Sequence, residues 1–458
     1  MGISVKEGLT RSSLGNIPLI ILTVDDICDY IYANPVEVDL EGSYSFQDII
    51  KEFSELYQSD ERLWSTIGGK CKHCEFVSQE NDNGLKSGFI ECWKHATNLS
   101  EDQLQSPLVL ELWGGRIDKA IADGIYLLKD LKETYYWPKE FEARTGLHPA
   151  ERKRLQIEKA RNGDSTPYLD TEGLKRIFDE LEPPYHFIDF ETTMVALPFH
   201  AGRRPYEGIA FQYSYHLMDE NGNIHHKGQF LNPDQHFPNY NFVRALKNDL
   251  ADTKGTIFRY HNHENTYLRT IRKQLLNERN ENVTDKKELI DFIDQITHAK
   301  EEKFEGPRDM VDLFALVLSY YYSPFAKGSN SIKAILPAVI HDSEFIREKY
   351  SKPIYGNATI PSLNFTNHQW IQADKEMNPY KTLPQILDKY SNEYLEEFHP
   401  MPNEEIRDGG AAMMAYSYLQ FTDIHPVQKK AIREALLKYC ELDTMAMVMI
   451  WEYWRSAV

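Results

Sequence analysis

Between residues 185 and 276 the spacing of apolar and polar positions changes several times, which predicts alternating strands and helices. An Asn-Gly pair within 219–223 predicts a tight hairpin between two of the strands, and a later helix would return the chain for a strand beside the first. Strands are predicted over 185–190, 208–218, 224–231 and 255–260, and helices over 242–251 and 264–276.

Helical spacing dominates the rest of the chain. The fold class predicted is therefore α/β, with a mixed sheet flanked by helices and preceded by a mostly helical N-terminal region. Helices are expected within 24–58, 103–183 and 285–350 and over about 426–455, with an irregular Pro-rich stretch at 353–403. The predicted domains are a helical region with a cysteine cluster over 1–100, a helical connector over 101–180 and a third domain over 181–458.

Composition narrows the class of protein. The chain has 458 residues, of which 41% are hydrophobic and 26% are charged, and no stretch approaches the roughly 18 apolar residues of a membrane helix. The apolar run at 17–24 is too short and too late for a secretory signal, so a cytoplasmic location is expected. The net charge of -19 argues against a generally basic surface for nucleic acid, although local basic patches stay possible.

Two carboxylates lie one residue apart in the first predicted strand. Asp189 and Glu191 face the same side, because side chains alternate along a strand, and two acids held that close favour a divalent cation between them. The same spacing recurs elsewhere in this chain, so taken alone it is better explained by a strand end that reaches water.

Two later segments supply further candidates. Tyr439 and Asp443 are four residues apart and share one face of the last predicted helix, amid apolar residues that make an open-water position for the acid unfavourable. Glu264 follows a predicted strand and begins a helix, where α/β sheets usually place their chemistry. The helix dipole alone also explains an acid at that position.

As an ordered set, Asp189-x-Glu191, Glu264 and Tyr439-x3-Asp443 resemble the three motifs of DEDDy exonucleases of the ribonuclease H-like fold. The resemblance implies that the four acids hold two Mg²⁺ or Mn²⁺ ions and that Tyr439 orients the attacking water. It also implies hydrolysis from a 3′ end of single-stranded nucleic acid. Glu264 departs from the family, which usually has Asp there, so a catalytically degenerate scaffold that binds nucleic acid or a partner protein is the alternative.

Longer stretches, including "GSNSIKAILPAVI" and "YCELDTMAM", resemble an uncharacterised bacterial family. In that family such a domain follows a RecB-like segment similar to CRISPR-associated nucleases. The resemblance implies a nuclease fold and a bacterial origin, without fixing a substrate. A third alternative is a remnant of a larger DNA-repair or phage-defence nuclease, regulated by a partner protein that supplies the missing RecB-like half.

Cys71-x2-Cys74-x17-Cys92-x2-His95 has the spacing of a four-ligand metal site, and that spacing favours zinc. The family resemblance instead implies a 4Fe-4S cluster on the three cysteines. In that case Cys28 or His95 would complete the ligand set.

Local basic residues are candidates for phosphate contacts. Arg203 and Arg204 follow the acid strand. The segment "KGSNSIKAI" places Lys327, Ser329 and Lys333 at a predicted helix start, where backbone amides and a hydroxyl would face a phosphate. An ordinary capped helix explains that segment about equally well.

Overall fold

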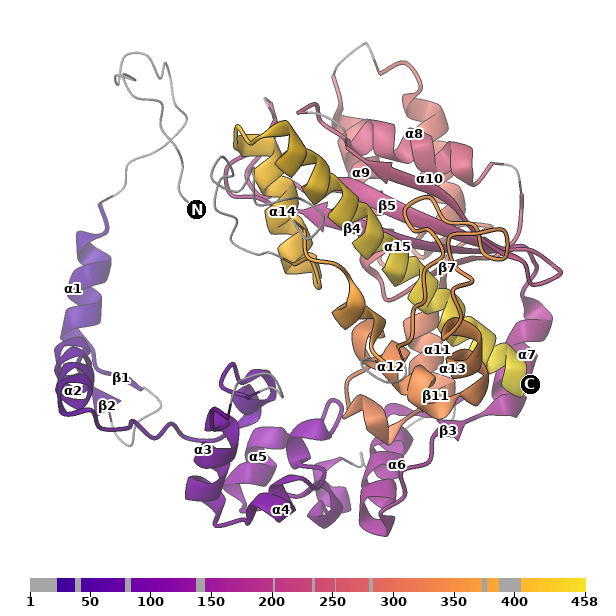
Figure 1. Cartoon of the computed structure of the whole chain (residues 1–458). Helices are drawn as coiled ribbons and strands as arrows, with labels where there is room; N and C mark the ends of the chain where they lie inside the picture. The colour runs from indigo at the N-terminus through magenta and orange to yellow at the C-terminus, as the bar shows by residue number, and fades with distance from the viewer. Residues whose placement is uncertain are drawn as a thin grey trace. The chain divides into compact units, whose positions relative to one another are not determined.

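The chain divides into two compact units, Met1–Ser106 and Pro107–Val458, in the computed structural model (Figure 1). The apolar run at 17–24 lies almost wholly outside the described residues, as does part of the Pro-rich stretch. The structure describes residues 23–37, 43–78, 84–136, 145–200, 202–232, 235–251, 253–279, 283–372, 377–386 and 405–458.

The first unit is mostly helical, as the sequence predicts. Between its first two helices, a short antiparallel ribbon pairs Val36 with Tyr44. Ser45 then caps the second helix by accepting a hydrogen bond from the backbone N–H of Asp48 at 3.2 Å. The elements are α1 (Asp25–Ala33), β1 (Val36–Glu37), β2 (Ser43–Tyr44), α2 (Phe46–Ser59), η2 (Gly69–His73), α3 (Gly88–Thr97) and α4 (Glu101–Leu104).

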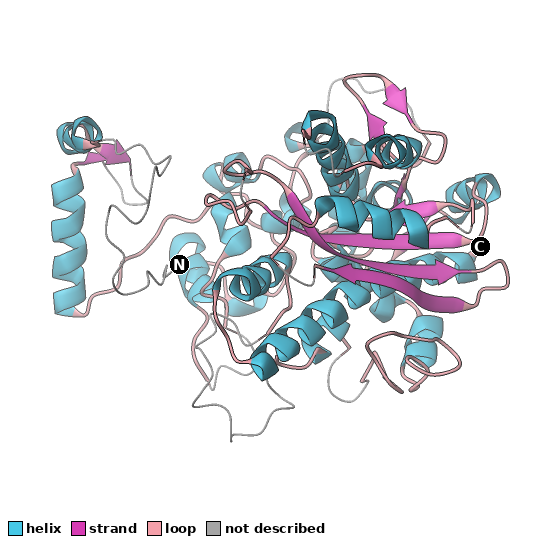
Figure 2. Cartoon of the chain, turned by 90° about the horizontal axis from the view of Figure 1, so that it is seen from above, coloured by secondary structure: helices cyan, strands magenta, loops and turns pink. Residues whose placement is uncertain are grey.

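The second unit is built on a five-stranded mixed sheet, which confirms the predicted fold class (Figure 2). Its central strand, β4 (Tyr185–Thr193), pairs antiparallel with β5 (Ile209–Met218) on one side and parallel with β7 (Ile257–Arg259) on the other. The order across the sheet is β10 (Val311–Asp312), β7 (Ile257–Arg259), β4 (Tyr185–Thr193), β5 (Ile209–Met218) and β6 (Ile224–Leu231).

The hairpin between β5 and β6 forms at the predicted Asn-Gly turn. Asp219 accepts hydrogen bonds from the backbone N–H groups of Asn221 and Asn223, and Gly222 takes a φ of +82°, which favours glycine. The chain then passes through α8 (Asn239–Asp249) and returns as β7, parallel to β4. Both connections follow the prediction.

Helices cover both faces of the sheet, and the alternation of side chains along β4 assigns each face its core. Ile188 and Phe190 pack toward α8, α9 (His263–Asn277) and α10 (Lys286–Ile296). Phe187 points to the opposite face, which α15 (Pro426–Ala457) crosses (Figure 1). Asp189 and Glu191 share the parity of Phe187, so this alternation directs them toward α15.

The segment predicted to be mostly helical over 103–183 is helical only in parts. Residues 103–183 contain short helical pieces separated by turns, and the two longer helices among them are α6 (Pro149–Asn162) and α7 (Thr171–Glu180). The elements are η3 (Val109–Glu111), α5 (Ile117–Ala122), η4 (Leu128–Asp130), η5 (Glu133–Tyr135), α6 (Pro149–Asn162), β3 (Tyr168–Leu169) and α7 (Thr171–Glu180).

Residues 285–350 are largely helical, but short paired strands interrupt them. Here α12 packs against α15, which brings the start of α12 toward the acid strand. Among the described residues, no helix has the length and apolar character needed to cross a membrane. The elements are β8 (His298–Ala299), β9 (Phe304–Glu305), α11 (Leu313–Tyr320), β11 (Tyr321–Tyr322), η6 (Pro324–Ala326), α12 (Ile332–Asp342), α13 (Glu344–Tyr350), η7 (Pro379–Thr382) and α14 (Gly409–Phe421).

Candidate metal centre

Three carboxylates from distant parts of the sequence meet between β4 and α15. Asp189 and Glu191 come from β4, and Asp443 comes from α15. One oxygen from each of the three lies within 4.8 Å of the others. Glu191 and Asp443 are buried at 6% and 5% exposure, whereas Asp189 is partly exposed. We call Asp189, Glu191 and Asp443 the acid triad.

Polar contacts fasten α15 to β5, the neighbour of the acid strand. The Gln212 side-chain amide donates to the Leu436 carbonyl at 2.6 Å, and the hydroxyls of Ser214 and Thr444 lie 2.8 Å apart. Ser214 is also the cross-strand partner of Asp189. Asp189 lies on β4, and the residues that bond α15 lie on β5, which is paired with β4. These contacts therefore fix the position of Asp443 relative to β4.

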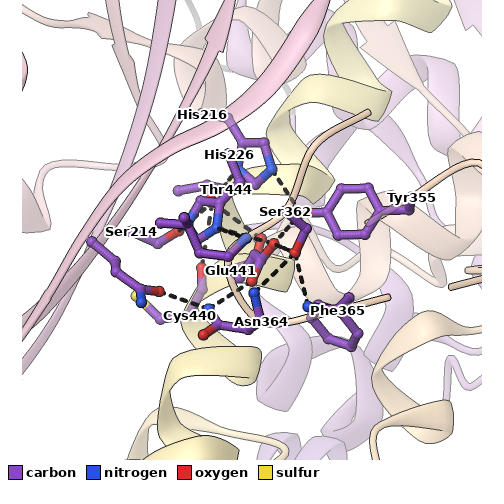
Figure 3. A network of polar contacts seen from close by, with 12 residues as sticks. Ser214, His216, His226, Tyr355, Ser362, Asn364, Phe365, Cys440, Glu441 and Thr444 are labelled. Atoms are coloured by element: carbon purple, nitrogen blue, oxygen red, sulfur yellow. Dashed lines mark hydrogen bonds and ion pairs between the residues drawn. The ribbon is translucent and has the colours of Figure 1, made fainter. Parts of the chain in front are cut away.

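A second acid of α15, Glu441, anchors a network of polar contacts (Figure 3). Its carboxylate lies 3.0 Å from Nδ1 of His226, and it accepts a hydrogen bond from the Tyr355 hydroxyl at 2.5 Å. It also accepts hydrogen bonds from Ser362 and, at 2.7 Å, from the Asn364 side chain. With this many donors, the Glu441 carboxylate is fully satisfied without a cation.

The same network includes a second histidine. His216 contacts the Thr444 hydroxyl through Nδ1 at 2.7 Å and the Tyr355 hydroxyl through Nε2 at 2.8 Å. Burial lowers the pKa of His216 well below its ordinary value, so the ring is neutral and bridges α15 to the loop that carries Tyr355. The role of this network is to hold α15 in place.

Two tyrosines contact the triad through Asp443. The Tyr380 hydroxyl donates to Asp443 Oδ1 at 2.5 Å, and a side-chain hydrogen bond from Tyr439 also lowers the pKa of Asp443. Tyr439 is 2% exposed, and burial together with the nearby acids raises its pKa well above the ordinary value. Its hydroxyl is therefore protonated at neutral pH and suited to positioning another group.

Crowding of buried acids makes the triad costly to ionise. Burial raises the pKa of Asp189 well above its ordinary value, and the neighbouring charges of Asp443, Glu264 and Glu191 add to the increase. Burial and Asp443 raise the pKa of Glu191 to about 8. The charge of Lys333 opposes the increase at both residues. A divalent cation would remove this cost by replacing the protons.

Glu264 lies near the triad but is not part of it. It occupies the first turn of α9 at 1% exposure, and a backbone hydrogen bond from Phe190 reaches its carboxyl. Burial raises its pKa to about 8. Its Oε2 has no hydrogen-bond partner within the described part of the chain, so a buried oxygen is left for a further ligand.

The residues present fit Mg²⁺ or Mn²⁺. All the available ligand atoms are carboxylate oxygens, which these hard cations prefer. The unpartnered Oε2 of Glu264 offers one more oxygen beside Asp189. The structure thus brings together Asp189, Glu191 and Asp443 as predicted, and it places Glu264 and Tyr439 at their edge.

Sequence reasoning missed two residues of this site. Tyr380 lies in η7, within the stretch predicted to be irregular, and only its hydrogen bond to Asp443 reveals its place. Cys440, three residues before Asp443 on α15, places its sulfur 3.8 Å from Asp189 Oδ2. Burial raises the pKa of the Cys440 thiol well above its ordinary value, so it is present as a neutral thiol.

The cysteine metal centre expected in the first unit is not assembled. Among the described residues, Cys71, Cys74, Cys92 and His95 supply no group of three ligand atoms within 4.8 Å of one another, and Cys28 is exposed on α1. The His95 ring stacks on the Trp64 ring, with the ring centroids 4.0 Å apart. The prediction of zinc or a 4Fe-4S cluster is therefore corrected.

Arg203 and Arg204 lie in the loop after β4, where Arg203 is engaged within the protein. It lies 2.7 Å from Glu278 and 3.4 Å from Glu207, and its guanidinium covers the Phe237 ring at 3.6 Å. Arg204 donates its backbone N–H to Glu207.

The "KGSNSIKAI" segment leads into α12. Lys327 is exposed in a left-handed conformation after η6, and the Ser329 backbone N–H donates to the Ala326 carbonyl. The Ser331 N–H reaches the Ser329 hydroxyl at 3.4 Å, so amides of this loop are used within it. Lys333 instead points to Tyr439.

Comparison with known proteins leaves the site without a described function. No curated protein and no solved structure matches the chain. A family model does match one part of the chain. That part contains Asp189, Glu191 and Glu264, whereas Tyr439 and Asp443 lie beyond it. Residues 186–331 match the family model of a domain of unknown function, DUF2779.

Proposed function

We propose that this protein is a metal-dependent 3′ to 5′ exonuclease that acts on single-stranded nucleic acid. The observation that carries the proposal is the convergence of Asp189, Glu191 and Asp443 within 4.8 Å in a largely buried place. Several buried acids with only one nearby cationic side chain are typical of sites that bind divalent cations. The ordered resemblance to DEDDy exonucleases supplies the reaction class.

The chemistry divides between cation and protein. Bound Mg²⁺ or Mn²⁺ supplies Lewis acidity, which activates water and stabilises the charge on the leaving oxygen. In the reaction, a water oxygen joins the terminal phosphorus, the bond from phosphorus to the 3′ oxygen breaks, and a proton moves to that oxygen. The acid triad and Glu264 would hold the cations, while the neutral Tyr439 hydroxyl would orient the water.

A single experiment tests the activity. Single strands labelled at the 3′ or the 5′ end are incubated with protein and Mn²⁺, and wild type is compared with Asp189→Ala and Asp443→Ala. Rapid release of the 3′ label with stepwise shortening of the 5′-labelled strand, lost in both variants, is the expected result. Glu434→Ala, on the exposed side of α15, is the matched control and should keep full activity.

One observation favours a second candidate function, a degenerate scaffold that binds nucleic acid or a partner protein. Glu264 is not among the carboxylates that lie within 4.8 Å of one another. Mn²⁺ binding to wild type together with intact labelled strands would favour this second function.

A further inference from the structure

Lys333 makes a directed contact with the tyrosine of the site. It comes from the first turn of α12, and its Nζ donates to the Tyr439 hydroxyl at 2.7 Å. The same ammonium lies 5.0 Å from the centre of the Tyr439 ring and 5.7 Å from that of Tyr380. Because an ammonium group only donates, the Tyr439 oxygen must accept here, and its own proton is left for another partner.

That other partner is Asp443. A side-chain hydrogen bond from Tyr439 lowers the pKa of Asp443, alongside the charge of Lys333 and the hydrogen bond from Tyr380. The contacts therefore form a chain of fixed polarity, in which Lys333 donates to Tyr439 and Tyr439 donates to Asp443. A reversed chain is excluded, because Lys333 has no acceptor to offer.

The backbone that carries Lys333 is firmly held. The carbonyl of Asn330 accepts from the Tyr260 hydroxyl at 2.6 Å, and its side-chain oxygen accepts from Arg152 at 2.5 Å. Gly328 has a φ of +73°, and a Cβ there would lie 1.6 Å from the Glu111 carbonyl oxygen. These contacts fix the position of the loop before α12. They therefore also fix the point from which Lys333 extends toward Tyr439.

We propose that Lys333 is a positioning residue, which sets the direction of hydrogen bonding at Tyr439 and keeps its ammonium group beside the acid triad. This inference rests on the proposed function and deepens it. It differs from a direct phosphate contact, because Lys333 would act through Tyr439 and its removal would affect the chemical step more than substrate binding.

The kinetic test compares Lys333→Met, Lys333→Arg, Tyr439→Phe and the double variant Lys333→Met/Tyr439→Phe on 3′-labelled single strands. Lys333→Met should lower kcat by about 10- to 100-fold with KM changed by less than about 3-fold, and Lys333→Arg should recover most of the loss. The double variant should be no slower than the slower single variant, since one residue acts through the other. Lys430→Met, on the exposed side of α15, is the matched control.

A loss confined to KM, or losses that multiply in the double variant, would overturn the proposal in favour of an independent phosphate contact. A second measurement needs no activity. Mn²⁺ binding at pH 9, where proton competition at the acids is reduced, followed by the electron spin resonance of free Mn²⁺, should tighten by about 3- to 10-fold in Lys333→Met because a repelling charge is gone.

Unchanged Mn²⁺ affinity in Lys333→Met would overturn the proposal even if no substrate is ever cleaved. If Mn²⁺ binding responds as expected while labelled strands stay intact, the proposed exonuclease fails and the charge placement of Lys333 stands.

Discussion

Glu441 and Asp443 lie two residues apart on α15, yet their pKa values move in opposite directions. Burial raises the pKa of both carboxyls. At Glu441, the hydrogen bonds and charge of His226, with Ser362 and Tyr355, outweigh burial and lower the pKa. At Asp443, Lys333 and two tyrosines do not outweigh burial, and the pKa stays raised. One acid is therefore structural, and the other is available to a cation.

Replacing Glu441 should destabilise the fold. Glu441→Ala leaves the buried side chains of His226 and Tyr355 without this acceptor, so the free energy of unfolding should fall by about 3 to 5 kcal/mol. Urea denaturation measures the change. Glu434→Ala, whose side chain is partly exposed and 3.9 Å from Lys430, should change it by less than about 0.5 kcal/mol. Equal effects of the two variants would contradict the structural role of Glu441.

Stability without divalent cations should fall as pH rises. Glu191 and Glu264 have folded-state pKa values of about 8 against an ordinary 4.5, so the folded protein binds more protons than the unfolded chain between these limits. The free energy of unfolding therefore decreases with pH across that window. Urea denaturation from pH 5 to pH 8.5 in the presence of a chelator measures the slope.

The comparison that isolates these two acids is the double variant Glu191→Gln/Glu264→Gln. It should show a shallower decrease than wild type, because the other titrating groups are common to both proteins. Adding Mg²⁺ at pH 8 should raise the stability of wild type more than that of the variant. Identical slopes for the two proteins would show that these carboxyls do not titrate as described.

Removing the Tyr380 hydroxyl should weaken the site. Tyr380→Phe deletes the 2.5 Å hydrogen bond to Asp443, and loss of such a supporting contact typically lowers metal affinity or activity by about 10- to 100-fold. Mn²⁺ titration and the labelled-strand assay both measure the effect. Tyr213→Phe is the matched control, since that hydroxyl bonds Asp249 at 2.7 Å on the opposite face of the sheet. A comparable loss in the control would point to general destabilisation.

Gly328→Ala should be more damaging than alanine at another glycine with positive φ. A Cβ at Gly328 would lie 1.6 Å from the Glu111 carbonyl oxygen, whereas one at Gly222, with φ of +82°, meets nothing within 4 Å. The expected loss of unfolding free energy is about 2 to 5 kcal/mol at Gly328 and about 1 to 2 kcal/mol at Gly222. Similar melting temperatures for the two variants would refute the close approach.

Local signals carried the prediction of the sheet and of half the site. The alternation around Asp189, the Asn-Gly turn and the long final helix, with Asp443 amid apolar residues, each depend on neighbours in the sequence, and each is found in the structure. Tyr380 could not be found this way, because it sits in a stretch without periodicity and reaches Asp443 only through the tertiary fold.

The spacing of the cysteines predicted a metal site that the structure does not form. Cys71, Cys74 and Cys92 have the separations of a metal knuckle, but convergence also requires a turn that directs three sulfurs to one point. The three thiols do not share such a point in the described residues. For Lys333, the sequence indicated a charge at a helix start, while its partner Tyr439 lies 106 positions away.

The hydrogen bonds between α15 and β5 also prevent α15 from rotating about its own axis. Successive residues of an α-helix are about 100° apart around its axis, so a slip of one position would swing Asp443 away from Asp189 and bring a neighbour round in its place. Apolar packing contacts alone would tolerate such a rotation, since one apolar side chain can take the place of the next. The hydrogen bonds of Gln212 to the Leu436 carbonyl and of Ser214 to Thr444 form at only one rotation of the helix about its axis. They therefore keep Asp443 aligned with Asp189 and Glu191.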